Sequence, residues 1–379
     1  MRQLITAVLF AYFLAGSLVQ AEPLKHFAYD SSVEGGHPLS PHLVHIADKD
    51  VLAPEKYYMG TQNTLPDKHW YLNPTSPTTE NTTGTIQSPI MACACASCVF
   101  DVGTSSLFPQ GQGGIFYLKY AFQDQNRNWK SSSRAPAADN EDKQVRTHTV
   151  TAGVRYMFNQ DWGLQVDVPF VHRMFKVDAG GSSPAVLNWN QLGDVRVRGI
   201  YTGFKQDMSL GVTFGAKFPT GSHTHQEAVG DIDRDTQVGT GSTDLLLGIF
   251  YRDAFCKSES WKWFAQADLD VPILTRGEFI PGYEVNSAIG LYYSSWAIKD
   301  LKITPVAQII GSIRGSDRGV NSANPVASGF ERILVAPGIE FNLHPIMIYA
   351  DVEFPIYEYT RGNQLTSPVM FKIVMSYGF

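Results

Sequence analysis

The four cysteines are the residues with the widest chemical scope in this sequence. Cys93, Cys95 and Cys98 lie close together, and Cys256 follows far downstream. Closely spaced thiolates, with five histidines upstream of them, could ligate a soft metal such as Cu(I) or Zn(II). Disulfides are the alternative in an oxidising compartment, and four cysteines allow three pairings. The sequence leaves both open and firmly implies no cofactor.

Charged side chains that alternate with apolar ones are the second group of candidates. Four of them are followed two positions later by a proline: Asp167, Lys217, Asp270 and Glu353. Five further charges occur in similar segments: Arg155, Arg196, Arg198, Asp268 and Asp351. In an apolar environment such groups need water or partners of opposite charge. Their chemistry would be recognition of ions or polar solutes, or pairing with each other.

The segments that carry these charges alternate as β-strands do. Apolar and polar residues recur with period 2, which places them on opposite faces of a strand. In the last segment every second residue from Val369 to Phe379 is apolar, whereas Lys372 and Ser376 lie on the other face. Twelve strands are predicted in this way, at 113–123, 146–158, 162–174, 193–205, 208–218, 242–252, 261–273, 283–294, 301–312, 330–342, 346–357 and 367–379.

The connections between these strands alternate in length. Each odd-numbered strand is followed by a long connection, and most even-numbered ones by a short turn such as 159–161. Transmembrane barrels have short periplasmic turns, longer external loops and an even strand count. Charged residues make up only 17% of the chain, which is low for a soluble enzyme. We therefore expect residues 113–379 to form an all-β, up-and-down antiparallel barrel in the outer membrane of a Gram-negative bacterium.

Residues 1–112 lack this alternation. Arg2, the apolar stretch 4–18 and the residues up to Ala21 have the order of a cleaved secretory signal, which predicts removal of residues 1–21. Residues 22–112 are expected to form an irregular periplasmic extension or a plug in the lumen. Cys256 lies in 253–260, the longest of the periplasmic turns. The topology thus places all four cysteines on the periplasmic side, where one disulfide would tie the extension to the barrel.

The charged face of the strands would line the lumen. Asp167, Lys217, Asp270 and Glu353 fall near the outer ends of outward-running strands, which predicts a ring of inward charges acting as a selectivity element. Alternatively, the prolines behind them only end strands. The predicted strands 1, 2, 4, 5 and 12 are basic, and 7, 10 and 11 are acidic, which gives two opposed arcs. The other alternative is that these charges pair with each other or with a plug, and that nothing passes.

Two motifs carry a family resemblance. They are Lys217-Phe218-Pro219-Thr220-Gly221-Ser222 and Gly239-Thr240-Gly241-Ser242-Thr243-Asp244, the second leading into an alternating strand. Over 113–379 the chain resembles the outer-membrane transporters associated with the meta pathway of phenol degradation. The resemblance implies a single-chain barrel with a role in uptake or efflux. The extension with its cysteines departs from a bare barrel of this kind.

Three functions follow as hypotheses. The first is a narrow, porin-like channel or transporter for a small solute. The second is a metal-handling barrel whose Cys/His extension captures or delivers an ion, and the third is a closed barrel with a structural or enzymatic role. No serine stands in an obvious triad, so we expect no enzyme. Expected partners are outer-membrane lipid, the barrel assembly machinery, which would recognise the last strand, and a small solute. The net charge of −6 argues against nucleic acid.

Overall fold

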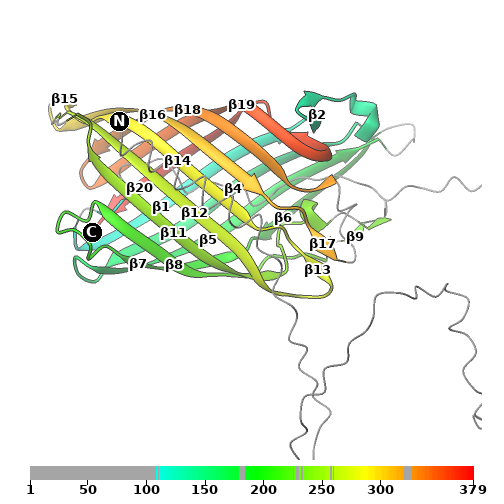
Figure 1. Cartoon of the computed structure of the whole chain (residues 1–379), viewed down its shortest axis with the longest axis horizontal. Helices are drawn as coiled ribbons and strands as arrows, with labels where there is room; N and C mark the ends of the chain where they lie inside the picture. Colours follow the sequence, from blue (N-terminus) through cyan, green and yellow to red (C-terminus); the bar gives the residue numbers. More distant parts are fainter. Residues whose placement is uncertain are drawn as a thin grey trace, which may run out of the picture. The chain divides into compact units, whose positions relative to one another are not determined.

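A computed structural model describes residues 108–379, except residues 110, 141, 179–183, 225, 228–229, 232–233, 257, 259 and 320–326. Twelve long strands in this part form a closed antiparallel barrel (Figure 1). They are β1 (Gly113–Gln125), β4 (Gln144–Met157), β5 (Trp162–Val177), β7 (Val195–Tyr201), β8 (Leu210–Phe218), β11 (Ser242–Ala254), β12 (Trp261–Thr275), β14 (Glu284–Tyr293), β16 (Leu301–Arg314), β18 (Phe330–Leu343), β19 (Ile346–Thr366) and β20 (Met370–Gly378). The predicted fold class and strand count are confirmed.

The barrel closes between its first and last strands. β1 and β20 pair antiparallel from Ile115 opposite Gly378 to Gln123 opposite Met370. Beyond this ladder, the N–H of Gly114 donates to the Phe379 carbonyl at 2.8 Å, and the N–H of Phe379 donates to the Gly114 carbonyl at 2.9 Å. The Phe379 ring packs over Gly114, so a Cβ atom at position 114 would displace that ring. Closure removes the unpaired strand edges that lipid does not tolerate.

The two faces of the wall differ as the alternation predicts. On β20, Ile373, Met375 and Tyr377 point outward and are 41%, 48% and 49% exposed, whereas Lys372 and Val374 point inward and are buried. The same outward exposure of large apolar side chains recurs around the barrel, as at Ile249 and Ile309. Such a continuous apolar outer surface is what a transmembrane barrel presents to lipid. The barrel is therefore an outer-membrane barrel that contacts lipid with this surface.

One end of the barrel carries the short turns. The turns after β4, β7, β11, β14 and β18 lie there together with Gly113 and Phe379, and this end is the periplasmic one by the loop rule. Outward aromatic pairs mark it: Trp162 stands opposite Tyr201 with ring centroids 4.7 Å apart, and Trp261 opposite Tyr293 at 5.1 Å. Tryptophan and tyrosine at such positions suit the lipid headgroup level.

At the opposite, external end the wall extends beyond the barrel. There β5 leaves β7 and pairs with β6 (Ala185–Leu192), while the long strand β19 continues to pair with β2 (Arg127–Ser131). β2 also pairs with β3 (Ser133–Arg134), and β6 and β2 project from one end of the barrel in Figure 1. The loops there carry β9 (Gln226–Glu227), β10 (Gly230–Asp231), β13 (Phe279–Ile280) and β17 (Arg318–Gly319), and β15 (Trp296–Ile298) lies at the periplasmic end.

The helical segments found in the described residues are the short 3-10 turns η3 (Ala137–Asn140) and η4 (Arg234–Thr236). Among these residues no helix is long and apolar enough to cross a membrane.

The four prolines that follow a charged residue lie where the strand ladder changes. Pro219 comes directly after β8, and Pro272 and Pro355 lie at register shifts of the β11–β12 and β18–β19 pairs. Pro169 lies where β5 changes its partner from β7 to β6. Proline has no N–H to give to a ladder, so it is tolerated at these places. Pro219 follows a strand end, as one of the two alternatives expected, whereas Pro169, Pro272 and Pro355 lie within β5, β12 and β19.

Candidate functional site: the lumen of the barrel

All nine charged residues predicted to line the lumen lie on the inward face of the wall. Six of them are buried: Arg155, Asp167, Arg198, Lys217, Asp351 and Glu353. The other three are partly buried: Arg196, Asp268 and Asp270. An interior with this many ionisable groups has a polar lining, which in a membrane barrel requires water or charge pairing. The contacts below show how much of the charge is paired.

The first ion-pair cluster joins three neighbouring strands. Lys217 on β8 contacts Asp244 on β11, which stands directly opposite it. Its Nζ also lies 3.6 Å from Asp270 Oδ2, and that oxygen lies 3.8 Å from Nη2 of Arg196. Arg196 and Lys217 are direct cross-strand neighbours, an arrangement that is destabilising for two like charges. The shared Asp270 carboxylate offsets that repulsion.

The second cluster lies across the barrel at the junction of β19 and β20. Nζ of Lys372 lies 3.2 Å from Asp351 Oδ2 and 3.3 Å from Glu353 Oε1. Asp351 Oδ2 also accepts hydrogen bonds from the Tyr349 hydroxyl at 2.8 Å and from Nε2 of Gln308 at 3.1 Å. The lysine is thus shared by two carboxylates, and one of these is fixed further by two neutral donors.

A third cluster surrounds Asp167 on β5. Its Oδ2 lies 3.1 Å from Nη1 of Arg198 and accepts a hydrogen bond from Nε2 of Gln165 at 3.0 Å. The hydroxyl of Tyr117 donates to its Oδ1. Arg155 and Asp268 lie nearby and line one cavity together with Arg198.

These contacts decide how the predicted ring of charges is built. The structure brings Lys217 and Asp270 within 3.6 Å of each other, but it pairs Asp167 with Arg198 and Glu353 with Lys372. The four residues therefore belong to three separate clusters, each with its own counter-charges. A role of these residues in selectivity stays a prediction.

The predicted arcs of opposite charge meet in two of these clusters. The basic strands β7 and β8 meet the acidic strand β12 at Asp270, and the basic strand β20 meets the acidic strand β19 at Lys372. Arg314 on β16 is buried inside, and Arg332 on β18 lines an inner cavity. Both lie on the acidic side, so the acidic arc is interrupted by cations that the sequence analysis did not include.

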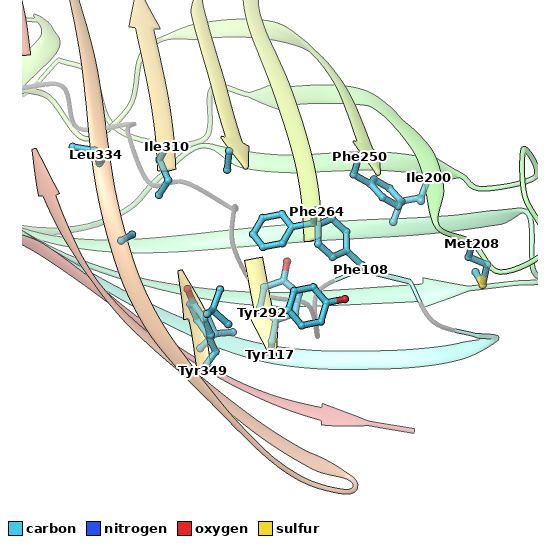
Figure 2. Close-up of a cluster of buried hydrophobic side chains, with 14 of the residues drawn as sticks. Phe108, Tyr117, Ile200, Met208, Phe250, Phe264, Tyr292, Ile310, Leu334 and Tyr349 are labelled. Atoms are coloured by element: carbon cyan, nitrogen blue, oxygen red, sulfur yellow. The ribbon is translucent and has the colours of Figure 1, made fainter. Parts of the chain in front are cut away.

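An apolar cluster lies in the lumen toward the periplasmic end. Figure 2 shows side chains from several strands converging on it, among them Tyr117, Phe250, Phe264 and Tyr292. Phe108, which precedes β1, lies within it with its ring centroid 5.3 Å from Phe250 and 5.6 Å from Phe264. Residue 108 belongs to the predicted extension 22–112, so at least the end of that segment occupies the lumen.

A second apolar cluster lies toward the external end of the lumen. It contains Val238 of the loop between β8 and β11, packed with residues from the strands: Val145, Val171, Phe175, Val177, Trp189 and Leu365. Arg173, fully buried on β5, holds this loop by donating from Nη1 to the carbonyls of Thr236 at 2.5 Å and Gln237 at 3.0 Å. The external loop is therefore folded into the mouth and anchored there by a buried cation.

The loop is also anchored at its two ends. Asp194, at the start of β7, accepts hydrogen bonds from the backbone N–H groups of Gly221 and Thr240 and from the Thr240 hydroxyl, each at 2.9 Å. These donors come from the two motifs that carry the family resemblance. Gly221 and Gly239 are packed so closely that a Cβ at Gly239 would strike the Gly221 backbone. The glycines are thus required by the close approach of the loop ends.

Two loop side chains have shifted ionisation. Burial lowers the pKa of His223, and the positive charge of Arg234 lowers it further. Burial also lowers the pKa of Arg234, but a guanidinium keeps its charge near neutral pH. The lowered pKa of His223 favours its neutral imidazole.

The predicted cysteine site lies mostly outside the described residues. Cys93, Cys95 and Cys98 fall in the part of the chain that the structure leaves undescribed, and Cys256 is exposed in the turn after β11. The periplasmic placement of Cys256 agrees with the topology. Within the described residues no group of three or more metal-ligating side chains occurs. Disulfide and soft-metal binding both stay predictions.

The residues that pack inside the lumen are those that sequence reasoning missed. Phe108 lies in a segment without alternation, and Arg173 was read as an ordinary strand residue. One signal for Arg173 was available in the sequence. It shares the inward face of its strand with Val171 and Phe175, which are both apolar. The loop contacts join residues more than 60 positions apart, which no local pattern encodes.

Comparisons with known proteins agree on the architecture. A scan against protein-family models found no match, and neither did a search of curated proteins. Among solved structures, an outer-membrane channel from Pseudomonas putida F1 superposes with a TM-score of 0.55 at 10% identity, over 74% of this chain and 100% of that one. The β domain of the Bordetella autotransporter BrkA (TM-score 0.43, 10% identity, 71% and 100%) and the CymD monoaromatic hydrocarbon channel (0.38, 10%, 71% and 89%) are also similar. The chain has the fold of an outer-membrane channel barrel.

Proposed function

We propose that this protein is a narrow, gated outer-membrane channel for a small solute. One observation carries the proposal: a polar, charged lumen holds, toward each end, an apolar side chain from outside the barrel wall. Phe108 lies toward the periplasmic end and Val238 toward the external end. A purely structural barrel would gain nothing from an inner lining of ion pairs, which cost desolvation and are weak evidence for stability.

A structural neighbour with the same barrel architecture is named as an outer-membrane channel, which favours a channel over an enzyme. The resemblance of the 217–222 and 239–244 motifs to transporters associated with phenol degradation makes a solute from aromatic degradation the first candidate. The outward alternation of β20 and its terminal aromatic further support recognition by the barrel assembly machinery.

Planar-bilayer recording tests the proposal. Purified full-length protein is inserted into a bilayer beside the double variant Phe108→Ala/Arg173→Met, which loosens the packing toward both ends of the lumen. Wild type is expected to give small, intermittent current steps, and the double variant larger and longer ones. Both proteins are first shown by circular dichroism to be folded. An absence of current in both folded proteins would contradict a channel.

A further inference from the structure

A cavity lies between the two apolar clusters of the lumen. It is lined by Thr149 and Thr151 of β4. On the same strand, Arg155 lines the cavity beside Phe108 and Val145 belongs to the external apolar cluster, so the central cavity lies between the two. Its lining reaches from β1 and β5 across to the folded-in loop and to Phe279 of β13. A ligand held there would lie between Phe108 and the external loop that carries Val238.

The lining of this cavity has more positive than negative groups. Five basic side chains border it, Lys119, Arg196, Lys217, Arg234 and Arg314, against two acidic ones, Asp167 and Asp194. Both acids are engaged: Asp194 accepts three hydrogen bonds from the loop ends, and Asp167 pairs with Arg198. The lining therefore carries more cationic than anionic groups, and both of its carboxylates are already engaged within the protein.

The counter-ions of Lys217 and Arg314 are not part of the lining. Asp244 and Asp270, which pair with Lys217, are not part of the cavity lining. Arg314 likewise bonds to Asp317, which is outside the lining, at 2.9 Å. These pairs fix the positions of Lys217 and Arg314, and the excess of cations over carboxylates in the lining itself leaves a positive field in the cavity.

Arg234 is the cation best placed to recognise a ligand from the loop. Its Nη2 donates to the Thr240 carbonyl at 3.1 Å, and its guanidinium lies 4.8 Å from the centroid of the Phe279 ring. Among the described residues its buried Nε has no hydrogen-bond partner. A buried N–H donor without an acceptor is costly, and a ligand oxygen would satisfy it.

The other residues of the lining indicate the chemistry of the rest of the ligand. Phe279, Pro281, Val171 and Val238 give the cavity an apolar side. A ligand with one anionic end and an apolar body fits this lining better than an inorganic ion does. The cavity has a volume of about 80 Å³. At about 10–15 Å³ for each water molecule, this is room for roughly six waters. That space admits a small organic acid and excludes an oligosaccharide.

We propose that this cavity is a binding site for a small organic monocarboxylate, with Arg234 as the residue that binds its carboxylate. The inference rests on the proposed channel function and names the substrate class of that channel. Its occupant is held by Arg196, Lys217 and Arg234, with its apolar body toward Phe279.

Calorimetric titration of folded, detergent-solubilised full-length protein with benzoate tests the site without requiring any current. Benzoate is expected to bind, and benzyl alcohol, its uncharged counterpart, to bind at least tenfold more weakly. Arg234→Gln is expected to weaken benzoate binding about tenfold to hundredfold, the range of one charge-assisted hydrogen bond. Arg234→Lys keeps the charge and is expected to lose less. Arg318→Gln, an exposed arginine of another external loop, is the matched control and is expected to bind as wild type.

Bilayer recording of the same proteins separates the two proposals. A reversal potential on the anion-selective side in a KCl gradient, reduced in Arg234→Gln, supports the site within a working channel. Benzoate binding lost in Arg234→Gln, but without current in any variant, supports the site and contradicts the channel. Current in wild type with no benzoate binding, or with equal binding of benzoate and benzyl alcohol, overturns the carboxylate site and leaves the channel standing.

Discussion

The ring of Phe108 packs against that of Phe250 inside the barrel, with centroids 5.3 Å apart. Phe250 belongs to the wall, whereas Phe108 comes from the segment that precedes β1. The next residue is held as well, because Nη2 of Arg252 donates to the Pro109 carbonyl at 3.0 Å. The end of the N-terminal segment is thus fixed by an aromatic contact and by a hydrogen bond from the wall.

Phe108→Ala is expected to increase the permeability of the barrel. Truncating a buried phenylalanine typically costs about 3–5 kcal/mol, and here that loss falls on the packing of a chain segment rather than on the strand ladder. Liposome swelling in a small sugar is expected to be at least twofold faster than with wild type. Phe255→Ala, at an exposed position in the turn after β11, is the matched control and is expected to swell at the wild-type rate. Equal rates for all three proteins would contradict a closure by Phe108.

Arg173→Met is expected to release the external loop. The variant removes the hydrogen bonds to the Thr236 and Gln237 carbonyls, and each bond from a charged donor is worth about 1.5–3 kcal/mol. Trypsin added to intact cells is then expected to cleave after Arg234 at least tenfold faster, as followed by mass spectrometry. Arg146→Met, at a half-exposed arginine on β4 paired with Asp124, serves as the control. Unchanged cleavage at Arg234 would show that Arg173 does not hold the loop.

Lys372→Met is expected to destabilise the barrel. It leaves the buried carboxylates of Asp351 and Glu353 without their shared cation, and breaking a buried ion pair from one side costs about 3–5 kcal/mol. The free energy of unfolding in urea, measured in lipid vesicles, is expected to fall by that amount. Lys302→Met, an exposed lysine of β16, is expected to change it by less than about 0.5 kcal/mol. The triple variant Lys372→Met/Asp351→Asn/Glu353→Gln removes the unpaired charges and is expected to regain stability. If it is no more stable than Lys372→Met alone, the unpaired carboxylates do not cause the destabilisation.

Docking of the external loop is expected to weaken in acid. Burial, and then the charge of Arg234, lowers the pKa of His223 from its ordinary value of 6.5. The docked loop therefore binds fewer protons than the free loop, so docking is strongest above pH 6.5 and weakens as the pH falls through the lowered pKa. An NMR titration of histidine-labelled protein is expected to show a His223 pKa below 6.5 that rises in Arg234→Gln. A His223 pKa above 6.5 would contradict the packing described.

The twelve strands were predictable from the sequence because lipid and lumen impose opposite polarity on alternate residues. Most predicted ends differ from the structure by one to three residues, and the largest error is at β19, which continues to Thr366 instead of ending at 357. There the strand leaves the membrane and pairs with β2. Alternation fades in that part because lipid no longer contacts one face. The β5–β6 extension was missed for the same reason.

The inward direction of the charges was predictable from the same alternation, but their partners were not. Whether Asp270 lies beside Lys217 or beside another inward charge depends on the stagger between β8, β11 and β12, and a register shift next to Asp244 alters that stagger. The two apolar clusters depend on tertiary packing of Phe108 and Val238, for which the sequence shows no periodic signal. The period-2 alternation thus predicts the strands of the barrel wall, but it does not predict which side chains pack inside the lumen.

Cysteine accessibility in a conducting channel tests the account most directly. Thr151 points into the lumen and lines the central cavity, whereas its neighbour Val150 points outward and is 41% exposed. Thr151→Cys and Val150→Cys are recorded in bilayers before and after addition of a charged methanethiosulfonate reagent, with wild type as the control for the native cysteines. The account predicts that the reagent reduces the current of Thr151→Cys by more than half and leaves Val150→Cys and wild type unchanged. Current that is equally insensitive in all three proteins would contradict a solute path through this lumen.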